Sequence, residues 1–286
     1  MDLLQQTKEL CRLYNIKPAR SRGQNFLIRE EIYDDIVVAA NLQSDDVVLE
    51  VGPGLGFLTA KLAKKAGRIV AVELDDKLAE VLHTGLLAQE AKNVEVINQN
   101  VLDIIDNPHL TPFLKGGSYK IVANLPYNIT SVFLRKFLSE SENKPKLTVL
   151  MLQKEVAQRI CAQAGAMSLL AISVQLYATP EIVQIVPKEY FWPQPEVDSA
   201  IVKITPHASY LFNKEVGEKD FFRLVKFGFV AKRKMLKNNL AAGLKISQSE
   251  AENKIAKAGF NSKIRAQELS INDWFKLFVE FRHNML

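Results

Sequence analysis

The stretch from residue 30 to residue 153 repeats one pattern: a short run of Val, Ile and Leu, and a longer segment with apolar residues at helical spacing. Apolar runs without alternation are typical of strands that are buried on both faces. Strands that alternate with helices in this way form a parallel sheet with helices on both faces, so we expect an α/β fold. The predicted strands are 47–52, 68–75, 93–100, 119–127 and 146–153, and the predicted helices are 30–41, 57–67, 77–91 and 131–140.

The remainder of the chain changes character near residue 206. Segments 168–178 and 181–187 fit two strands or a helix followed by a strand, and 199–206 fits a late strand. Four later segments have helical spacing with lysine and arginine interleaved, at 219–231, 232–244, 247–259 and 270–286. We expect a Rossmann-like α/β domain over 1–205 and a small all-helical domain over 206–286, joined near the polar stretch 205–218.

The positive charge is concentrated in the C-terminal part. The net charge is +5, yet residues 206–286 hold 15 Lys and Arg against 8 Asp and Glu, whereas residues 1–205 hold 22 against 24. A second basic stretch lies near the N-terminus and contains Lys8, Arg12, Lys17, Arg20, Arg22 and Arg29. Two basic segments around a mildly acidic middle favour a polyanionic partner such as a nucleic acid, although solvated surfaces give the same pattern.

Other classes of protein fit this sequence poorly. The two cysteines, Cys11 and Cys161, have no neighbours at metal-ligand spacing, so we expect neither a disulfide framework nor a metal site. No apolar stretch approaches the ~20 residues that span a membrane, and the first residues lack the apolar core of a signal peptide. We therefore expect a cytoplasmic protein with no membrane partner. Nothing in the sequence requires a dimer, and we expect a monomer.

A glycine-rich loop, EVGPGLG at 50–56, follows the first predicted strand of the sheet and leads into a helix. Glycines let a ligand approach the backbone, and a helix N-terminus offers free N–H groups, although a tight turn without a ligand can have the same sequence. Glu73, at the end of the next strand, has the position of a carboxylate that binds ribose hydroxyls. The spacing E-x-G-x-G-x-G differs from the G-x-G-x-x-G of dinucleotide sites, which favours S-adenosylmethionine over NAD.

The most specific motif is Asn124-Leu125-Pro126-Tyr127, at the carboxyl end of the fourth predicted strand. Ligands bind at this edge of open parallel sheets. Asn124 offers an amide oxygen, and the residue before a proline is held extended, so the Leu125 carbonyl can face a ligand as a second acceptor. Two acceptors suit a primary amine, and Tyr127 offers a ring on which a flipped base can stack. Taken alone, the motif also fits a strand end followed by a turn.

Further motifs occur along nearly the whole chain: GQNFL at 23–27, MLQKEV at 151–156, FWPQPEVDSA at 191–200, KRKMLKNNL at 232–240 and RAQELS at 265–270. With the glycine loop and NLPY, they resemble, in the same order, the KsgA family of ribosomal RNA adenine N6,N6-dimethyltransferases. The resemblance implies S-adenosylmethionine-dependent dimethylation of adenines, two adjacent ones in a hairpin loop near the 3′ end of small-subunit (16S) ribosomal RNA. The implied partner is the small ribosomal subunit precursor, and no metal is implied.

The resemblance also assigns roles to individual residues. It implies that Asn124, Leu125 and Tyr127 hold the target adenine and that Pro126 belongs to the same catalytic motif. It also implies that Phe191 and Pro193 form part of the wall on the substrate side. From the residues alone, Phe191 could equally be a core aromatic. The resemblance further implies that a basic helix contacts the RNA, and this helix contains Lys232, Arg233, Lys234 and Lys237. The implied cofactor contacts are Asn25, Leu27, Gly52, Gly54, Glu73, Asn100 and Asn124.

Asn100 departs from the family pattern, which has aspartate at the end of the third strand. An aspartate there accepts a hydrogen bond from the adenine amine of the cofactor. Asn100 can still accept through its amide oxygen, but without the charge, so the affinity for the cofactor can differ. Asp103 is an alternative acceptor, one helical turn further along the chain.

Three other functions compete with small-subunit RNA dimethylation. Large-subunit RNA methyltransferases of the macrolide-resistance type share the catalytic domain, but their C-terminal part differs, and the segments 232–240 and 265–270 favour the small-subunit enzymes. An RNA-binding assembly factor would not need catalysis, and the intact loop and NLPY motif disfavour it. A NAD-dependent oxidoreductase is disfavoured by the loop spacing and by the basic C-terminal domain.

Overall fold

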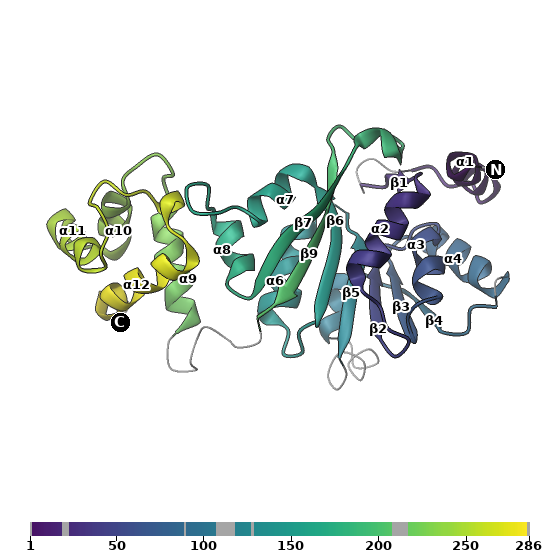
Figure 1. Cartoon of the computed structure of the whole chain (residues 1–286), viewed down its shortest axis with the longest axis horizontal. Helices are drawn as coiled ribbons and strands as arrows, with labels where there is room; N and C mark the ends of the chain where they lie inside the picture. The colour runs from purple at the N-terminus through teal and green to yellow at the C-terminus, as the bar shows by residue number, and fades with distance from the viewer. Residues whose placement is uncertain are drawn as a thin grey trace. The chain divides into compact units, whose positions relative to one another are not determined.

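The computed structural model describes residues 2–18, 23–88, 90–106, 118–126, 129–207 and 217–284. The chain forms two compact units. The first contains residues 1–157 and 178–206, and the second contains residues 158–177 and 207–286. We call them the α/β unit and the helical unit (Figure 1).

A seven-stranded sheet forms the centre of the α/β unit, in the order β4-β3-β2-β5-β6-β9-β7. The five strands predicted between residues 47 and 153 are all present and pair in parallel, and β9 runs antiparallel to both of its neighbours. The segments 168–178 and 181–187 prove to be a helix followed by a strand. The strands are β2 (Val47–Val51), β3 (Arg68–Glu73), β4 (Val94–Asn98), β5 (Tyr119–Asn124), β6 (Leu147–Gln153), β7 (Ala178–Val186) and β9 (Ser199–Pro206).

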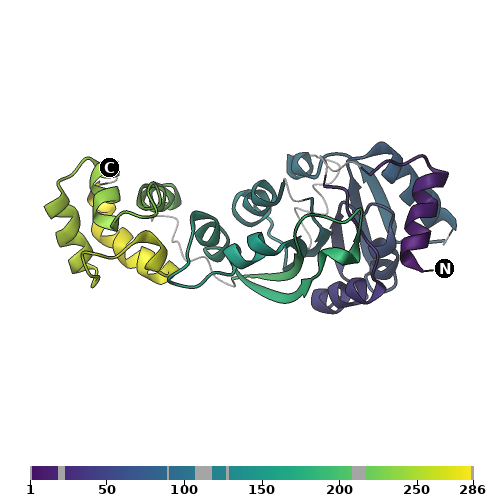
Figure 2. The same ribbon diagram turned by 90° about the horizontal axis from the view of Figure 1, so that it is seen from above.

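Helices cover both faces of this sheet, as the alternating pattern predicts (Figure 2). The apolar sides of three helices, within residues 32–40, 58–62 and 82–86, join the strands in one core, which includes Ile36, Leu62, Ile69 and Met151. A separate two-stranded ladder pairs β1 (Phe26–Leu27) with β8 (Phe191–Trp192). The helices of this unit are α1 (Leu3–Leu13), α2 (Glu30–Ala40), α3 (Phe57–Ala63), α4 (Asp76–Ala88), α6 (Thr130–Arg135), which continues as one π-helical turn (Lys136–Glu140), and the first part of α7 (Lys154–Ile160).

A buried lysine fastens α2 to the sheet. The ammonium of Lys120, on β5, donates to the carbonyl oxygens of Ala40 and Asn41 at 3.2 and 2.6 Å and lies 2.7 Å from Asp46 Oδ2. The last carbonyls of a helix carry partial negative charge, so a cation there is favourable. Lys120 therefore has a partner on each side, and its burial fixes the end of α2 against β5.

The helical unit contains α8 (Leu169–Gln175), α9 (Glu218–Gly228), α10 (Leu236–Leu244), α11 (Gln248–Lys257) and α12 (Ile271–Phe281). Residues 158–177 belong to this unit, whereas the sequence pattern assigned them to the domain over 1–205. Hydrogen bonds between segments that are distant in the sequence explain the difference. The Gln267 carbonyl accepts hydrogen bonds from Gly165 and Met167, and the Tyr177 hydroxyl bonds to Glu218. These bonds join segments that are 41 residues apart in one case and about 100 in the other, and periodicity does not reveal them.

The predicted helix over 232–244 is wrong in its first part. Residues 232–234 form a turn, and α10 begins only at Leu236. The cause is the buried side chain of Asn239, whose amide donates to the carbonyls of Gly228 and Ala231 at 2.7 and 3.0 Å. These bonds hold the chain in a turn between α9 and α10. The basic residues of KRKMLKNNL therefore precede the helix, except Lys237.

Candidate active site

A cavity of about 720 Å³ opens at the carboxyl ends of β2, β3 and β5. This is the edge at which parallel α/β sheets bind ligands, and the volume suits a small molecule. The cavity brings together residues from five segments that are well separated in the sequence. Those predicted from the sequence to contact a cofactor all line it: Asn25, Leu27, Gly52, Gly54, Glu73, Asn100 and Asn124.

The glycine loop provides the floor of the cavity in a conformation that suits glycine. Gly52 and Gly54 have φ angles of +64° and +58°, in the left-handed region that residues with a side chain rarely adopt. A Cβ on Gly52 would lie 3.7 Å from the carbonyl oxygen of Asn124, and one on Gly54 would lie 3.4 Å from the Phe26 ring. The loop backbone therefore lies close to both the NLPY segment and the GQNFL segment.

Glu73 is fixed by two backbone hydrogen bonds. The Gly54 N–H donates to Oε2 at 3.1 Å, and the Asp75 N–H donates to Oε1 at 3.0 Å. Burial raises the pKa of Glu73, and the two N–H donors oppose that shift. Each carboxylate oxygen has two lone pairs, so both can accept a further bond. Glu73 is thus held in place with free acceptor capacity, as ribose hydroxyls require.

Glu50 is a cavity residue to which the sequence assigned no role of its own. Its side chain is 1% exposed, and neither carboxylate oxygen has a hydrogen-bond partner in the described part of the chain. Burial raises its pKa to about 8, the nearby hydroxyl of Thr59 opposes that shift, and the charge of Glu73 adds to it. Ionisation of this buried group without a partner is costly, and a cationic ligand group would favour the ionised form. The signal in the sequence was a single acidic residue inside the apolar run VVLEV.

The NLPY segment leaves the sheet at the cavity. The Leu125 N–H donates to the Met151 carbonyl at 3.2 Å, and the Ile129 N–H donates to the Pro126 carbonyl at 3.2 Å. Asn124 and Pro126 line the cavity, whereas the buried Leu125 is not among the lining residues. Tyr127 lies outside the described residues, so its predicted stacking role stays a prediction.

Asn100 lies two residues beyond the end of β4 and lines the cavity. Its side-chain oxygen accepts a hydrogen bond from the Leu102 N–H at 3.0 Å, which caps the short 3₁₀ helix Val101–Asp106. Asp103, the alternative acceptor, is exposed and does not line the cavity. Position therefore favours Asn100 over Asp103 as the residue that faces a ligand here.

Phe191 and Pro193 are not among the residues that line this cavity. Phe191 is 3% exposed and belongs to the main core, which is the alternative that the sequence left open. It pairs with Leu27 across the β1–β8 ladder and so holds the cavity wall in place. Pro193 is half-exposed. A substrate contact by either residue would have to lie outside the cavity.

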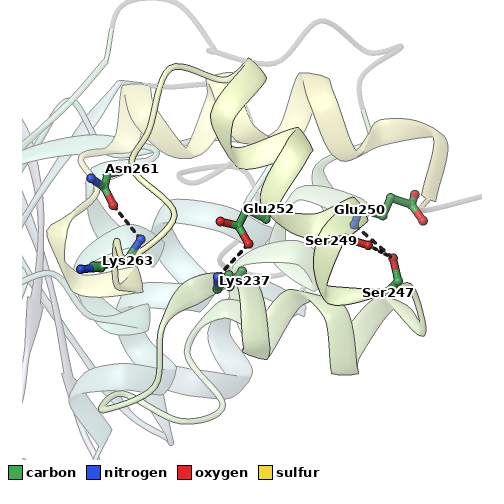
Figure 3. Close-up of polar contacts among 7 residues, drawn as sticks. All are labelled: Lys237, Ser247, Ser249, Glu250, Glu252, Asn261 and Lys263. Carbon is green, nitrogen blue, oxygen red and sulfur yellow. Dashed lines mark hydrogen bonds and ion pairs between the residues drawn. The ribbon is translucent and has the colours of Figure 1, made fainter.

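The four basic residues singled out in the helical unit differ in environment. Lys232, Arg233 and Lys234 are exposed in the turn before α10. Lys237 is only 18% exposed, and its ammonium lies 2.8 Å from Glu252 Oε2 on α11 (Figure 3). The pair joins α10 to α11, so Lys237 has a role inside the unit. The exposed basic side chains of the motif KRKMLKNNL are therefore those of the turn 232–234.

Two other kinds of site are absent from the described residues. No group of three or more His, Cys, Asp and Glu side chains is arranged to hold a metal ion. None of the helices there is long and apolar enough to cross a bilayer.

Comparison with known proteins matches residues 16–283 to the family model described as ribosomal RNA adenine dimethylase. The ribosomal RNA small subunit methyltransferase A of Dehalococcoides mccartyi is 43% identical over 283 residues, which are 99% of this chain and 94% of that protein. The protein of the same name from Halothermothrix orenii is 37% identical and covers 97% of this chain and 95% of its own length.

Two solved structures are similar over most of the chain. A dimethyladenosine transferase from Plasmodium falciparum has a TM-score of 0.73 at 28% identity and covers 91% of this chain and 98% of its own. The 23S rRNA methyltransferase ErmE has a TM-score of 0.73 at 26% identity and covers 90% and 100%. These likenesses confirm the expected α/β methyltransferase fold. With the match to the family model over nearly its whole length, the chain belongs to the ribosomal RNA adenine dimethylase family.

Proposed function

We propose that this protein dimethylates the N6 amine of adenines in small-subunit ribosomal RNA, with S-adenosylmethionine as the methyl donor. The observation that carries the proposal is the cavity at the ends of β2, β3 and β5, where the glycine loop, Glu73 and Asn124 meet. Relatives at 37–44% identity named as small subunit methyltransferases support the choice of substrate.

The residues of the cavity fit S-adenosylmethionine. Glu73 has free lone pairs for the ribose hydroxyls, and Asn100 offers a side chain near the place of the adenine. The buried Glu50 carboxylate has no partner of its own in the described chain, and the ammonium of the methionine part would supply one. A dinucleotide would instead need donors for two phosphates, and it would bring anions close to Glu50 and Glu73.

The chemistry requires the target amine to be held in one geometry. When bound, S-adenosylmethionine supplies a methyl group on an electrophilic sulfonium. An adenine amine is a weak nucleophile because its lone pair is delocalised into the ring. The Asn124 amide oxygen, at the cavity edge, accepts a hydrogen bond from this amine and directs its lone pair toward the methyl group. Positioning of this kind can supply up to ~7–11 kcal/mol of the barrier reduction.

The basic turn 232–234 would contact the RNA backbone outside the cavity. Its three exposed cations can neutralise phosphates, and such contacts give affinity that falls steeply with salt. The proposed partner is therefore ribosomal RNA in a precursor of the small subunit, recognised through its backbone by the helical unit and through an extruded adenine by the cavity.

Large-subunit RNA is the second candidate substrate. ErmE matches this fold with the same TM-score as the dimethyladenosine transferase, so the fold alone does not choose between the two classes. Sequence favours the first, because the small-subunit relatives reach 43–44% identity and ErmE 26%.

A direct test combines cofactor binding with product analysis. Calorimetry with S-adenosylhomocysteine and, separately, with NAD should give binding to the first only. Small subunits from cells that lack adenine dimethylation should then yield N6,N6-dimethyladenosine after incubation with the protein and S-adenosylmethionine. Binding without any methylated nucleoside would overturn the enzymatic function and leave an RNA-binding assembly factor.

A further inference from the structure

The N-terminal helix α1 packs on the elements that form the cavity (Figure 1). Cys11, in α1, is 4% exposed, and Ile16, three residues after the helix, is 8% exposed. The residues buried with them come from β1, from the glycine loop and from α4. The buried cluster, which we call the brace cluster, consists of Cys11, Ile16, Phe26, Leu55, Leu78 and Val81.

Polar contacts connect the same segments. The Asn15 carbonyl accepts a hydrogen bond from Lys77 Nζ at 3.1 Å, and Gln24 Nε2 donates to Asp75 Oδ2 at 3.3 Å. Asp75 Oδ1 in turn accepts from the N–H groups of Lys77 and Leu78, at 3.1 and 3.3 Å, and so caps the start of α4. The N-terminal segment is therefore tied to the residues that begin α4.

These contacts lead directly to the cofactor residues. The Asp75 N–H holds one oxygen of Glu73, and the Gly54 N–H holds the other. Gly54 itself lies against the Phe26 ring of the brace cluster. Cys11 and Ile16 do not line the cavity, but Phe26, Leu55 and Leu78 of the same cluster do.

We infer that α1 and the segment after it are a positioning element: docking of Cys11 and Ile16 fixes the cavity wall, the glycine loop and the start of α4 in the arrangement that binds the cofactor. This inference rests on the proposed cofactor. Two events that favour one arrangement must favour each other to the same degree. Cofactor binding therefore holds α1 docked, and undocking of α1 weakens cofactor binding.

The two cysteines of the chain allow a direct test in the full-length protein. Cys11 lies in the brace cluster, and Cys161 lies in the helical unit. Alkylation by iodoacetamide would be followed by peptide mass spectrometry with and without saturating S-adenosylhomocysteine. We expect the ligand to slow alkylation of Cys11 at least threefold and to leave the rate at Cys161 unchanged.

Calorimetry on the same samples separates the possible failures. If S-adenosylhomocysteine binds but the rate at Cys11 does not change, or both cysteines slow equally, the positioning role is wrong and the proposed cofactor stands. If S-adenosylhomocysteine does not bind at all, the proposed cofactor fails, and the inference fails with it.

A pair of matched variants tests the reverse direction. Ile16→Ala should raise the KM for S-adenosylmethionine and the Kd for S-adenosylhomocysteine about tenfold, leave kcat unchanged and speed the alkylation of Cys11. Leu86→Ala removes an equally buried side chain from the far end of α4, in the main core, and should lower the melting temperature without changing KM. Ile16→Val gives a smaller shift of the same sign if the alanine variant does not fold. An Ile16 variant with reduced stability and unchanged KM would overturn the inference.

Discussion

Two sites of the chain, the cavity in the α/β unit and the contact between α10 and α11 in the helical unit, treat their acidic residues in opposite ways. In the α/β unit, burial raises the pKa of Glu50 and Glu73, and both face the cavity. In the helical unit, the hydrogen bond from Lys237 lowers the pKa of Glu252, and the pair joins two helices. The cavity keeps Glu50 and Glu73 able to bind a ligand, whereas Glu252 is already paired inside its unit and the basic side chains of the turn 232–234 remain exposed.

This difference separates the expected effects of substitutions. Changes at the cavity should alter methyl transfer or cofactor binding and leave RNA affinity in place. Changes in the turn 232–234 should do the reverse. A variant that altered both the reaction at the cavity and the affinity for RNA would show that the two functions are not separated in this way.

Asn124→Ala should have the largest effect. Without this acceptor the adenine amine is unoriented, so the rate of methyl transfer should fall about 10²–10³-fold, by analogy with removal of a preorganised hydrogen-bonding group. Affinity for S-adenosylhomocysteine should fall much less. Single-turnover methyl transfer and calorimetry measure the two quantities. A parallel loss of both would make Asn124 chiefly a cofactor residue.

Replacement of Lys232, Arg233 and Lys234 by alanine should weaken binding to the small subunit by about one to two orders of magnitude at moderate salt. The slope of log K against log salt should decrease by roughly 0.7–0.9 for each phosphate that the variant no longer neutralises. Filter binding over a salt series checks this, with cofactor affinity unchanged. Lys237→Ala is the matched control and should alter RNA affinity little, because its ammonium pairs with Glu252.

Gly54→Ala should raise the Kd for S-adenosylhomocysteine roughly tenfold. At a φ of +58° a side chain costs about 1–2 kcal/mol, so the free loop should relax, and binding must restore it. Glu73 also loses the Gly54 N–H in the relaxed loop. Calorimetry measures the shift, and RNA binding serves as the control. An unchanged Kd would show that the left-handed conformation is not needed for binding.

Glu50→Gln should have the smallest effect of these substitutions. It should change the way the melting temperature depends on pH by a few degrees. The pKa of Glu50 in the folded protein, about 8, exceeds its ordinary value of 4.5, so the folded state holds an extra proton between these pH values. Stability of the free protein should therefore fall as pH rises through this window, and the variant should lack that part of the fall.

Glu252→Gln supplies the opposite case for the same measurement. The lowered pKa of Glu252 predicts a loss of stability as pH falls through the acid range, and this variant should lack that loss. If the melting temperatures of Glu50→Gln and of the unchanged protein change with pH in the same way between pH 5 and 8, Glu50 is not held neutral in the free protein.

The sequence predicted the site well where a motif stands at a strand end. The ends of β2, β3 and β5 meet at one edge of a parallel sheet, so Gly52, Glu73 and Asn124 had to lie close together. Glu50 was missed as a separate site residue because its lack of a partner depends on how neighbouring elements pack. The start of α10 was misplaced because the amide bonds of Asn239 reach back to the end of α9. Interactions between elements decide such points, and local patterns do not contain them.

The most direct test of the central claim compares the two ribosomal subunits as substrates. Small and large subunits from cells without adenine dimethylation would be incubated separately with the protein and labelled S-adenosylmethionine, and the digested RNA would be analysed for nucleosides. A small-subunit methyltransferase should form N6,N6-dimethyladenosine in small-subunit RNA alone, and the Asn124→Ala variant should form none in either RNA. Label in large-subunit RNA, or no label in either while the cofactor still binds, would contradict the claim.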